Sequence, residues 1–352
     1  MTLAELTVDQ LRCIAHAKLN LAPRLSLIYG ENGSGKTSLL EAMFLLGRGR
    51  SFRTRSSERL ICLGEPQLTV FGVTAADSPH RVGLQVSRSE GVRARVDGAD
   101  LPALADLSTL LPIQAIDPDV HKLVEEGSYG RRRWLDWAVF HVEPGFAGHW
   151  SRYQRALKQR NALLKQGGGA LEAWDAELLT HGLPLTAARQ AVMEGLVPYW
   201  KRLVAALLAP AVEISFHRGW ARELELVQAL AQGQGRDRQR GSTGVGPHRA
   251  DVTLRCDGKP ARDVLSRGQQ KLVAAALILA QLQYLRAAAG LRPVLLLDDP
   301  AAELDDHRLG QFIAAVKDLQ TQLVVTSLRS DFRVFGQPES VFHVEQGRVQ
   351  EL

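Results

Sequence analysis

The feature that most constrains this chain is a glycine-rich segment at residues 30–37, which matches the pattern G-x-x-x-x-G-K-[ST]. An apolar run at residues 25–29 precedes it and is typical of a buried strand, and residues 38–44 follow it with the composition of a helix. Glycines let the backbone of such a loop approach a ligand closely, so that N–H groups converge on phosphate oxygens at the start of the helix. The sequence therefore predicts a nucleoside triphosphate site.

The side chains of this segment have separate predicted roles. Lys36 is expected to reach the β- and γ-phosphates, and Thr37 is expected to place its hydroxyl on Mg²⁺. A glycine-rich turn in a generic α/β domain is the alternative interpretation. The predicted nucleotide-binding residues are Gly30, Glu31, Asn32, Gly33, Ser34, Gly35, Lys36, Thr37 and Ser38.

The composition is that of a globular protein with a sizeable core, since 45% of the 352 residues are hydrophobic. Cys13, Cys62 and Cys256 are scattered and form no C-x-x-C pair, so neither a zinc site nor a disulfide framework is indicated. The N-terminus lacks a basic segment followed by a long apolar stretch, and no apolar run approaches the ~20 residues of a membrane span. We therefore expect a soluble, cytoplasmic protein with no membrane partner.

The character of the sequence changes twice along the chain. Residues 1–130 combine the strand, loop and helix above with short β-like runs, which predict a small antiparallel sheet. Residues 131–244 are mainly helical in pattern, although Gly195 and Pro198 should kink or interrupt their apolar stripe, and the polar run at 236–244 predicts a flexible connection. α/β character then returns. We predict an α/β ATPase domain at 1–130 and 245–352 with an inserted helical lobe at 131–244.

Positive charge is concentrated in the middle of the chain. The net charge is +5, and residues 131–245 carry 16 basic against 10 acidic side chains, whereas the flanking regions are balanced. A basic region on an otherwise balanced protein suits a polyanion partner. A solvated helical surface would explain the same excess.

A second motif lies at residues 294–299, where a continuous apolar run ends in Asp298 and Asp299. In phosphate-loop ATPases, an acidic residue at the end of a buried strand holds Mg²⁺, and a following acid polarises the attacking water. Asp298 fits the first role, and Asp299 fits the second as a shorter carboxylate than the usual glutamate. Together with Lys36, these are the predicted catalytic residues; a solvent-facing turn is the alternative for the two aspartates.

A third motif, Leu265-Ser266-Arg267-Gly268-Gln269, resembles the L-S-G-G-Q signature of ABC-type ATPases, with Arg267 in place of the first glycine. In that class the signature contacts the γ-phosphate held by the opposite subunit. The resemblance implies that Ser266, Gly268 and Gln269 complete the nucleotide site of a second subunit.

Three further positions are compared with the ABC pattern. Residues 302–305 resemble the D-loop that crosses the dimer interface. Thr326 and Ser327 stand where many ABC proteins have a switch histidine, which leaves the γ-phosphate sensor unassigned. Gln114 is either a glutamine that senses Mg²⁺ or an ordinary polar loop residue.

Taken in order, the motifs resemble those of the RecF family of bacterial recombination-repair ATPases. The resemblance implies an ABC/SMC-like ATPase head that forms a homodimer on ATP and acts as a slow switch, with Arg12 approaching the phosphates. It also implies binding to gapped DNA with single-strand/double-strand junctions, and loading of RecA with RecR and RecO in DNA repair and the SOS response. The motifs are Leu11-Arg12, residues 30–42, residues 49–53, residues 131–136, Gly246-Pro247-His248-Arg249 and residues 265–271.

Clustered arginines are the predicted DNA contacts, because phosphates require cations and no base-reading motif is present. The alternative is that these arginines pair with carboxylates or cap helices. The candidates are Arg48, Arg50, Arg53, Arg55, Arg131 and Arg132.

Two other functions are considered. One is a soluble ABC-type ATPase subunit of another assembly, such as a transporter, and the arginine-rich segments disfavour it. The other is a DNA-binding clamp in which ATP is structural and is not hydrolysed. The long coiled-coil arms of SMC and Rad50 proteins are excluded, because only about 115 interrupted residues separate the two halves.

Overall fold

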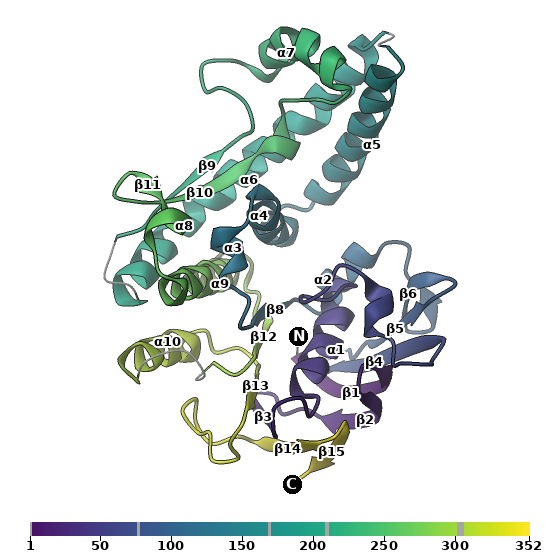
Figure 1. Ribbon diagram of the computed structural model, residues 1–352, viewed down its shortest axis with the longest axis vertical. Helices are drawn as coiled ribbons and strands as arrows, with labels where there is room; N and C mark the ends of the chain where they lie inside the picture. Colours follow the sequence, from purple (N-terminus) through teal and green to yellow (C-terminus); the bar gives the residue numbers. More distant parts are fainter. Residues whose placement is uncertain (1, 76–77, 168–169, 208–210, 301–305) are drawn as a thin grey trace. The chain divides into compact units, whose positions relative to one another are not determined.

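The computed structural model describes residues 2–75, 78–167, 170–207, 211–300 and 306–352 (Figure 1). The chain divides into two compact units, Met1–Val120 with Gly290–Leu352, and His121–Ala289. These bounds differ from the predicted domains because α9 (Arg267–Ala289) packs on α6 (Glu172–Leu207), α4 (Ser128–Val142) and α3 (Lys122–Glu125). Residues 245–289, predicted as part of the ATPase domain, therefore belong to the helical unit.

The first unit contains a six-stranded sheet in the order β15-β14-β3-β13-β12-β8. All neighbouring strands are parallel except the terminal pair, β14 and β15. The central strands are buried and apolar, as expected for a parallel sheet covered on both faces. The strands are β3 (Leu25–Tyr29), β8 (Ile113–Ile116), β12 (Val294–Leu297), β13 (Leu323–Ser327), β14 (Ser340–Glu345) and β15 (Arg348–Glu351).

A second, antiparallel sheet in the order β2-β1-β4-β5-β6-β7 confirms the predicted subsheet. Buried and exposed residues alternate along β4, so one face of the sheet turns to the core. Helix α1 (Lys36–Arg48) is almost entirely buried because it contacts strands of both sheets. The strands are β1 (Thr2–Leu11), β2 (Ile14–Asn20), β4 (Gln67–Ala75), β5 (Arg81–Ser87), β6 (Gly91–Val96) and β7 (Ala99–Asp100). The other helices described in this unit are η1 (Ser57–Leu60), η2 (Leu104–Asp106), α2 (Leu107–Leu110) and α10 (Asp306–Asp318).

The second unit is mainly helical, and its long helix α6 runs beside α5 (Phe146–Lys165) (Figure 1). The predicted interruption of α6 does not occur: Pro184 and Pro198 lie inside one continuous helix. Gly195 is needed in this helix because a Cβ at this position would lie 2.5 Å from the ring of Tyr284. The remaining elements are α7 (Leu226–Arg240), η3 (Pro247–Arg249), α8 (Ala261–Val264), and a sheet of β9 (Glu213–His217), β10 (Asp251–Cys256) and β11 (Lys259–Pro260).

The predicted flexible connection at 236–244 is instead largely helical, because α7 extends to Arg240. The buried Asp237 accepts a hydrogen bond from the fully buried Arg160 at 2.8 Å, and Gly241 ends the helix in the left-handed conformation. A polar sequence thus folds as a helix because its one buried carboxylate neutralises a buried cation.

Helix α9 would be long and apolar enough to cross a membrane if length and composition alone decided. However, 67% of its most apolar window is buried inside the protein, and Gln281 donates a hydrogen bond to the carbonyl of Trp134 at 2.6 Å. It is therefore built as a core helix of the second unit.

The Gly246-Pro247-His248-Arg249 motif lies within a buried polar network of this unit. The Tyr153 hydroxyl is 2.7 Å from Nδ1 of His248, whose Nε2 donates to the Thr243 carbonyl at 3.0 Å. Arg189 donates to the Pro247 carbonyl at 2.7 Å and forms a two-pronged ion pair with Asp136. Burial lowers the pKa of His248 to about 4 and raises the pKa of Tyr153 well above its ordinary value. Both side chains are therefore neutral at pH 7.

This network makes stability depend on pH. Between pH 6.5 and about 4 the unfolded chain protonates His248 whereas the folded chain does not, so stability should fall as pH decreases through this window. The loss attributable to this residue is up to about 3 kcal/mol. Urea denaturation of wild type and His248→Gln at pH 7 and pH 5 should show a smaller pH effect in the variant. Equal pH effects in the two proteins would contradict the assignment.

Candidate nucleotide-binding site

The glycine-rich loop connects the end of β3 to the first residue of α1. Gly35 occupies the N-cap of α1 with φ of 120°, a conformation that residues with a side chain rarely adopt. Gly30 passes so close to β14 that an added Cβ would lie 2.1 Å from the Val344 carbonyl oxygen. Both glycines are therefore required by the backbone, and the loop presents its N–H groups at a helix N-terminus.

Lys36 folds back across this loop. Its ammonium donates hydrogen bonds to the carbonyls of Gly30 at 2.7 Å and Glu31 at 2.8 Å, and the residue is only 7% exposed. Burial lowers the pKa of Lys36, while the nearby carboxylates of Asp299 and Asp298 oppose that shift. The ammonium is thus held over the loop, where incoming phosphate oxygens could replace the two carbonyls.

Asp298 follows β12 directly and is buried at the same sheet edge as the loop. Its carboxylate accepts hydrogen bonds from the Thr37 hydroxyl at 2.9 and 3.0 Å and from the Thr326 hydroxyl at 2.7 Å. The two threonines come from α1 and β13, so three elements meet at one carboxylate. Hydroxyl and carboxylate oxygens in this arrangement are the ligands that Mg²⁺ prefers.

Asp299 is half-buried next to Asp298 and has φ of 46°. Its backbone N–H donates to the Thr326 hydroxyl at 2.9 Å, which fixes the unusual conformation. Burial and the Asp298 carboxylate raise the pKa of Asp299, and Lys36 opposes this shift. A carboxylate with a raised pKa is a better proton acceptor than an ordinary surface aspartate.

These residues line one cavity of about 380 Å³. The cavity brings together predicted residues that are up to 287 positions apart in the chain, from Arg12 to Asp299. It is lined by Arg12, Cys13, Asn32, Gly33, Gly35, Lys36, Thr37, Ser38, Arg53, Pro118, Asp298 and Asp299.

Arg12 reaches the cavity from a turn with φ of 54° and is anchored by a buried acid. Its guanidinium donates to the two carboxylate oxygens of Glu41 at 2.6 and 3.0 Å, and Glu41 is fully buried in α1. The Ser51 hydroxyl also donates to Glu41. Sequence reasoning missed Glu41 as a site residue; the available signal was a lone acid on an otherwise apolar helix.

Gln114 is not placed at the cavity, which corrects its predicted contact with Mg²⁺. Gln114 lies within β8 and pairs with Leu295 of β12. Asp298 follows Leu295 by three residues, so Gln114 lies three residue positions short of the strand end at which Asp298 stands. The parallel register therefore buries Gln114 in the sheet, and Pro118 is the residue of this segment that lines the cavity. The D-loop-like residues 302–305 lie outside the described residues.

At the switch position, Ser327 and Thr326 end β13 with different contacts. The Ser327 hydroxyl accepts a hydrogen bond from the backbone of Arg329 at 3.1 Å. Thr326 instead contacts both aspartates, as described above. Of these two residues, Thr326 is therefore the one that contacts Asp298 and Asp299.

The arginines after α1 divide into different environments. Arg53 lines the nucleotide cavity, and Arg48 lies over the Phe44 ring at 5.5 Å. Arg50 is half-buried and Arg55 is exposed. The predicted DNA contacts therefore lie in different environments: Arg48 packs on α1, whereas the exposed Arg53 lies at the nucleotide cavity.

Arg131 and Arg132 are also drawn into the protein, which corrects their predicted role as DNA contacts. Arg131 is buried, forms a two-pronged ion pair with Asp251 at 3.0 Å, and donates to three backbone carbonyls. Arg132 donates to the Ala250 carbonyl at 2.7 Å and to the Ser128 hydroxyl. These donors hold α4 against β10, so the Arg131 guanidinium and Nη1 of the half-buried Arg132 are engaged within the protein.

The signature segment is in the second unit, at the start of α9. The backbone N–H of Ser266 donates to Oε1 of Gln269 at 2.9 Å, and the Ser266 hydroxyl accepts from the N–H of Gln269 at 3.3 Å. This reciprocal cap fixes the helix start. Ser266 is exposed, and a Cβ added at Gly268 would meet no atom within 4 Å, so the helix N-terminus is accessible.

Comparison with known proteins identifies the family of this chain. Residues 2–350 match the family model described as RecF/RecN/SMC N terminal domain. The DNA replication and repair protein RecF of Pseudomonas syringae pv. tomato is 39% identical over 359 residues, covering 99% of this chain and 98% of that protein. The chain belongs to the RecF family. A RecF of Shewanella baltica is 38% identical over 356 residues, covering 99% of both chains.

Solved structures show the same fold. A structure of the recombination mediator protein RecF with ATP has a TM-score of 0.88 and 28% identity, covering 100% of this chain and 97% of the other. An Smc head bound to the C-winged helix domain of ScpA has a TM-score of 0.59 at 14% identity, covering 100% and 98% of the two chains. The RecF family fold described here is therefore that of an ABC/SMC ATPase head with an antiparallel sheet and a helical insertion, as predicted.

The buried Arg12–Glu41 pair provides a stability test. Arg12→Met leaves the Glu41 carboxylate buried without its cation, so the free energy of unfolding should fall by about 3 kcal/mol. Arg12→Met/Glu41→Leu removes both charges and should be more stable than Arg12→Met alone. Urea denaturation measures both values, and a double variant less stable than the single one would refute the assigned coupling.

Proposed function

We propose that this protein is an ATP-dependent recombination mediator that binds ATP and Mg²⁺ at the cavity in its first unit. The observation that carries the proposal is the convergence of Lys36, Thr37 and Asp298 at one end of α1, where the loop can hold phosphates. The relatives support it, since a structure of the family is titled as RecF with ATP in the RecFOR pathway.

The residues present fit Mg²⁺. Thr37 and Asp298 supply hard oxygen ligands that already lie 2.9 Å apart, and Thr326 orients the carboxylate from its other side. When bound, the ion neutralises phosphate charge. Lys36 binds the phosphates, Arg12 adds a second cation whose position Glu41 fixes, and Asp299 orients the attacking water and accepts its proton.

The signature segment supports a site shared between two copies of the chain. Ser266 and the N-terminus of α9 offer hydroxyl and N–H donors that fit a phosphate. In ABC-type ATPases the equivalent segment contacts the nucleotide of the opposite subunit. We infer that ATP promotes homodimer formation and that slow, DNA-stimulated hydrolysis releases it.

DNA binding then requires exposed cations outside the nucleotide cavity. Helices α5 and α7 pack together and carry the best candidates, because most of their basic side chains face solvent. Their contacts with phosphates would be independent of base sequence and sensitive to salt. These residues are Arg152, Arg155, Lys158, Arg236, Arg238 and Arg240.

The wider role follows from the family. We infer that the dimer binds gapped DNA with single-strand/double-strand junctions in the cytoplasm and works with RecR and RecO to load RecA during DNA repair and the SOS response. A membrane-associated ABC subunit is the less supported alternative. Sedimentation of the wild type with ATP and gapped duplex DNA should show a dimer on DNA, which Lys36→Met should not form.

A mixing experiment tests the shared site. Lys36→Met disables the phosphate loop and Ser266→Arg blocks the signature, so each variant alone should sediment as a monomer with ATP. Their mixture should regain dimers, because one of the two sites then combines an intact loop with an intact signature. Failure of the mixture to dimerise, with both variants folded, would argue against a shared nucleotide site.

Asp299→Asn should separate stability from turnover. Because the folded-state pKa of Asp299 is raised, its carboxylate opposes folding once the pH exceeds that value. The variant should therefore have a higher Tm at pH 7, by an amount that shrinks as the pH falls towards the ordinary aspartate pKa, while ATP turnover falls at least about 100-fold.

Asp100→Asn is the control for this change. A hydrogen bond from Arg95 lowers the pKa of Asp100, which is the opposite direction, so this variant should gain no stability. An unchanged rate of ATP hydrolysis in Asp299→Asn would rule out the proposed role of that carboxylate.

A further inference from the structure

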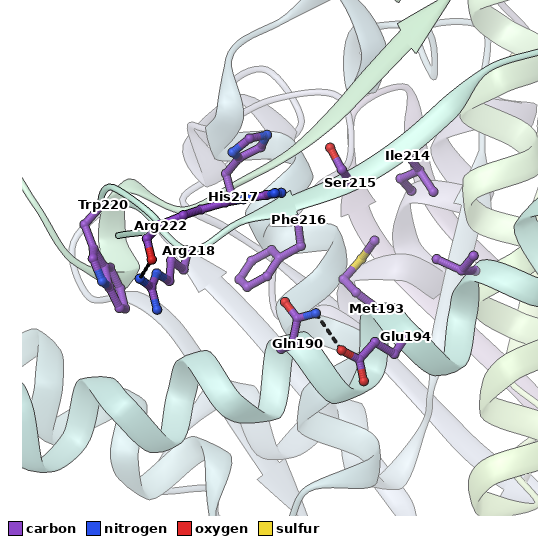
Figure 2. A pocket seen from close by; sticks show the side chains of 11 residues that line it. Gln190, Met193, Glu194, Ile214, Ser215, Phe216, His217, Arg218, Trp220 and Arg222 are labelled. Atoms are coloured by element: carbon purple, nitrogen blue, oxygen red, sulfur yellow. Dashed lines mark hydrogen bonds between the residues drawn. The ribbon is translucent and has the colours of Figure 1, made fainter. Parts of the chain in front are cut away.

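The second unit contains a groove of about 570 Å³ between α6 and β9 that the proposed ATPase mechanism does not use. Figure 2 shows Phe216 of β9 directed towards α6, where Gln190 and Glu194 are joined by a hydrogen bond. All the residues that line it belong to the same unit. The groove is therefore defined by the fold of that unit alone.

One wall of the groove is an edge strand. β9 pairs with β10 on one side, and within the described residues it is the last strand of its sheet. Four consecutive residues, 214–217, line the groove. Because side chains alternate between the faces of a strand, a run of four indicates that β9 presents its backbone edge there. An open edge of this kind is a template for pairing with another strand.

The other surfaces of the groove fit a ligand in which apolar side chains are next to acidic side chains. Met193 and Val197 of α6 form an apolar wall opposite the half-buried Ile214 and Phe216. At one end lies the exposed cation Arg222. An extended peptide could therefore place apolar side chains towards α6 and a carboxylate towards this cation.

The loop at this end is preformed. Arg218 donates from one nitrogen to the carbonyls of Ala221, Arg222 and Leu224, at 2.7 to 3.1 Å. Its guanidinium carbon also lies 4.8 Å from the centre of the Trp220 ring. A ligand would not have to order this loop on binding, which lowers the cost of association.

We propose that this groove binds an extended acidic and apolar peptide segment of a partner protein, which pairs as an additional strand with the edge of β9 that no described strand occupies. Arg222 binds a carboxylate of the peptide, and Phe216, Met193 and Val197 contact its apolar side chains. Single-stranded DNA fits less well, because a sugar–phosphate backbone cannot pair with the edge of a strand.

The test uses a short fluorescein-labelled peptide in which valine and glutamate alternate, with fluorescence anisotropy of the full-length protein. The wild type should bind it, and a peptide methylated on alternate backbone nitrogens should lose binding because it cannot pair with a strand. Arg222→Glu should weaken binding about tenfold and should instead favour a peptide with lysine in place of glutamate.

Lys259→Glu is the matched control, because it makes the same charge change at an exposed residue of β11 in the same unit, outside the groove. It should leave peptide binding unchanged. The proposal is overturned if the wild type does not bind the glutamate peptide or if Arg222→Glu does not reverse the charge preference. It is also overturned if a thymidine oligonucleotide displaces the peptide from the wild type but not from Arg222→Glu.

Discussion

The nucleotide site depends on the parallel pairing of β12, β13 and β3. In this register Leu297 pairs with Val325, and Val325 pairs with Leu27, so the three strands end together at one edge of the sheet. The backbone hydrogen bonds between these strands therefore place the glycine loop, Thr326 and Asp298 next to one another, independently of their side chains. A shift of one residue in any of these strands would turn its side chains to the opposite face and separate Asp298 from Thr37.

Buried charges organise both units. Glu41 is fully buried and holds Arg12 at the cavity, while the fully buried Arg160 and Arg189 bind Asp237 and Asp136 in the helical unit. Such pairs contribute little net stability compared with apolar packing, but removing one partner is costly. Each ion pair instead determines which two segments of the chain pack against one another.

The sequence predicted features that local patterns determine. The glycine loop, Asp298 after an apolar strand, and the capped signature helix each depend on a few neighbouring residues. The structure brings the first two together and leaves the third on a separate unit. The antiparallel subsheet was also predicted, because alternation and turn residues are local signals.

Features that depend on distant partners were not predicted. Arg131 looked like a DNA contact because its ion-pair partner, Asp251, lies 120 residues further along the chain. Gln114 looked like a loop residue because the register of β8 against β12 cannot be read from composition. Residues 236–244 looked flexible because nothing nearby in the sequence indicates that Asp237 neutralises a buried arginine.

The hydrogen-bond partners of the cations in the cavity also affect how the protein distinguishes the phosphates of a nucleotide from the phosphates of DNA. Lys36 donates to two loop carbonyls and Arg12 is paired with Glu41, so two of the three cations that line the cavity already have hydrogen-bond partners within the protein. Such a pocket attracts a polyanion weakly and admits only a ligand that can displace these partners within a narrow loop. We therefore expect the nucleotide site to discriminate against the phosphates of DNA.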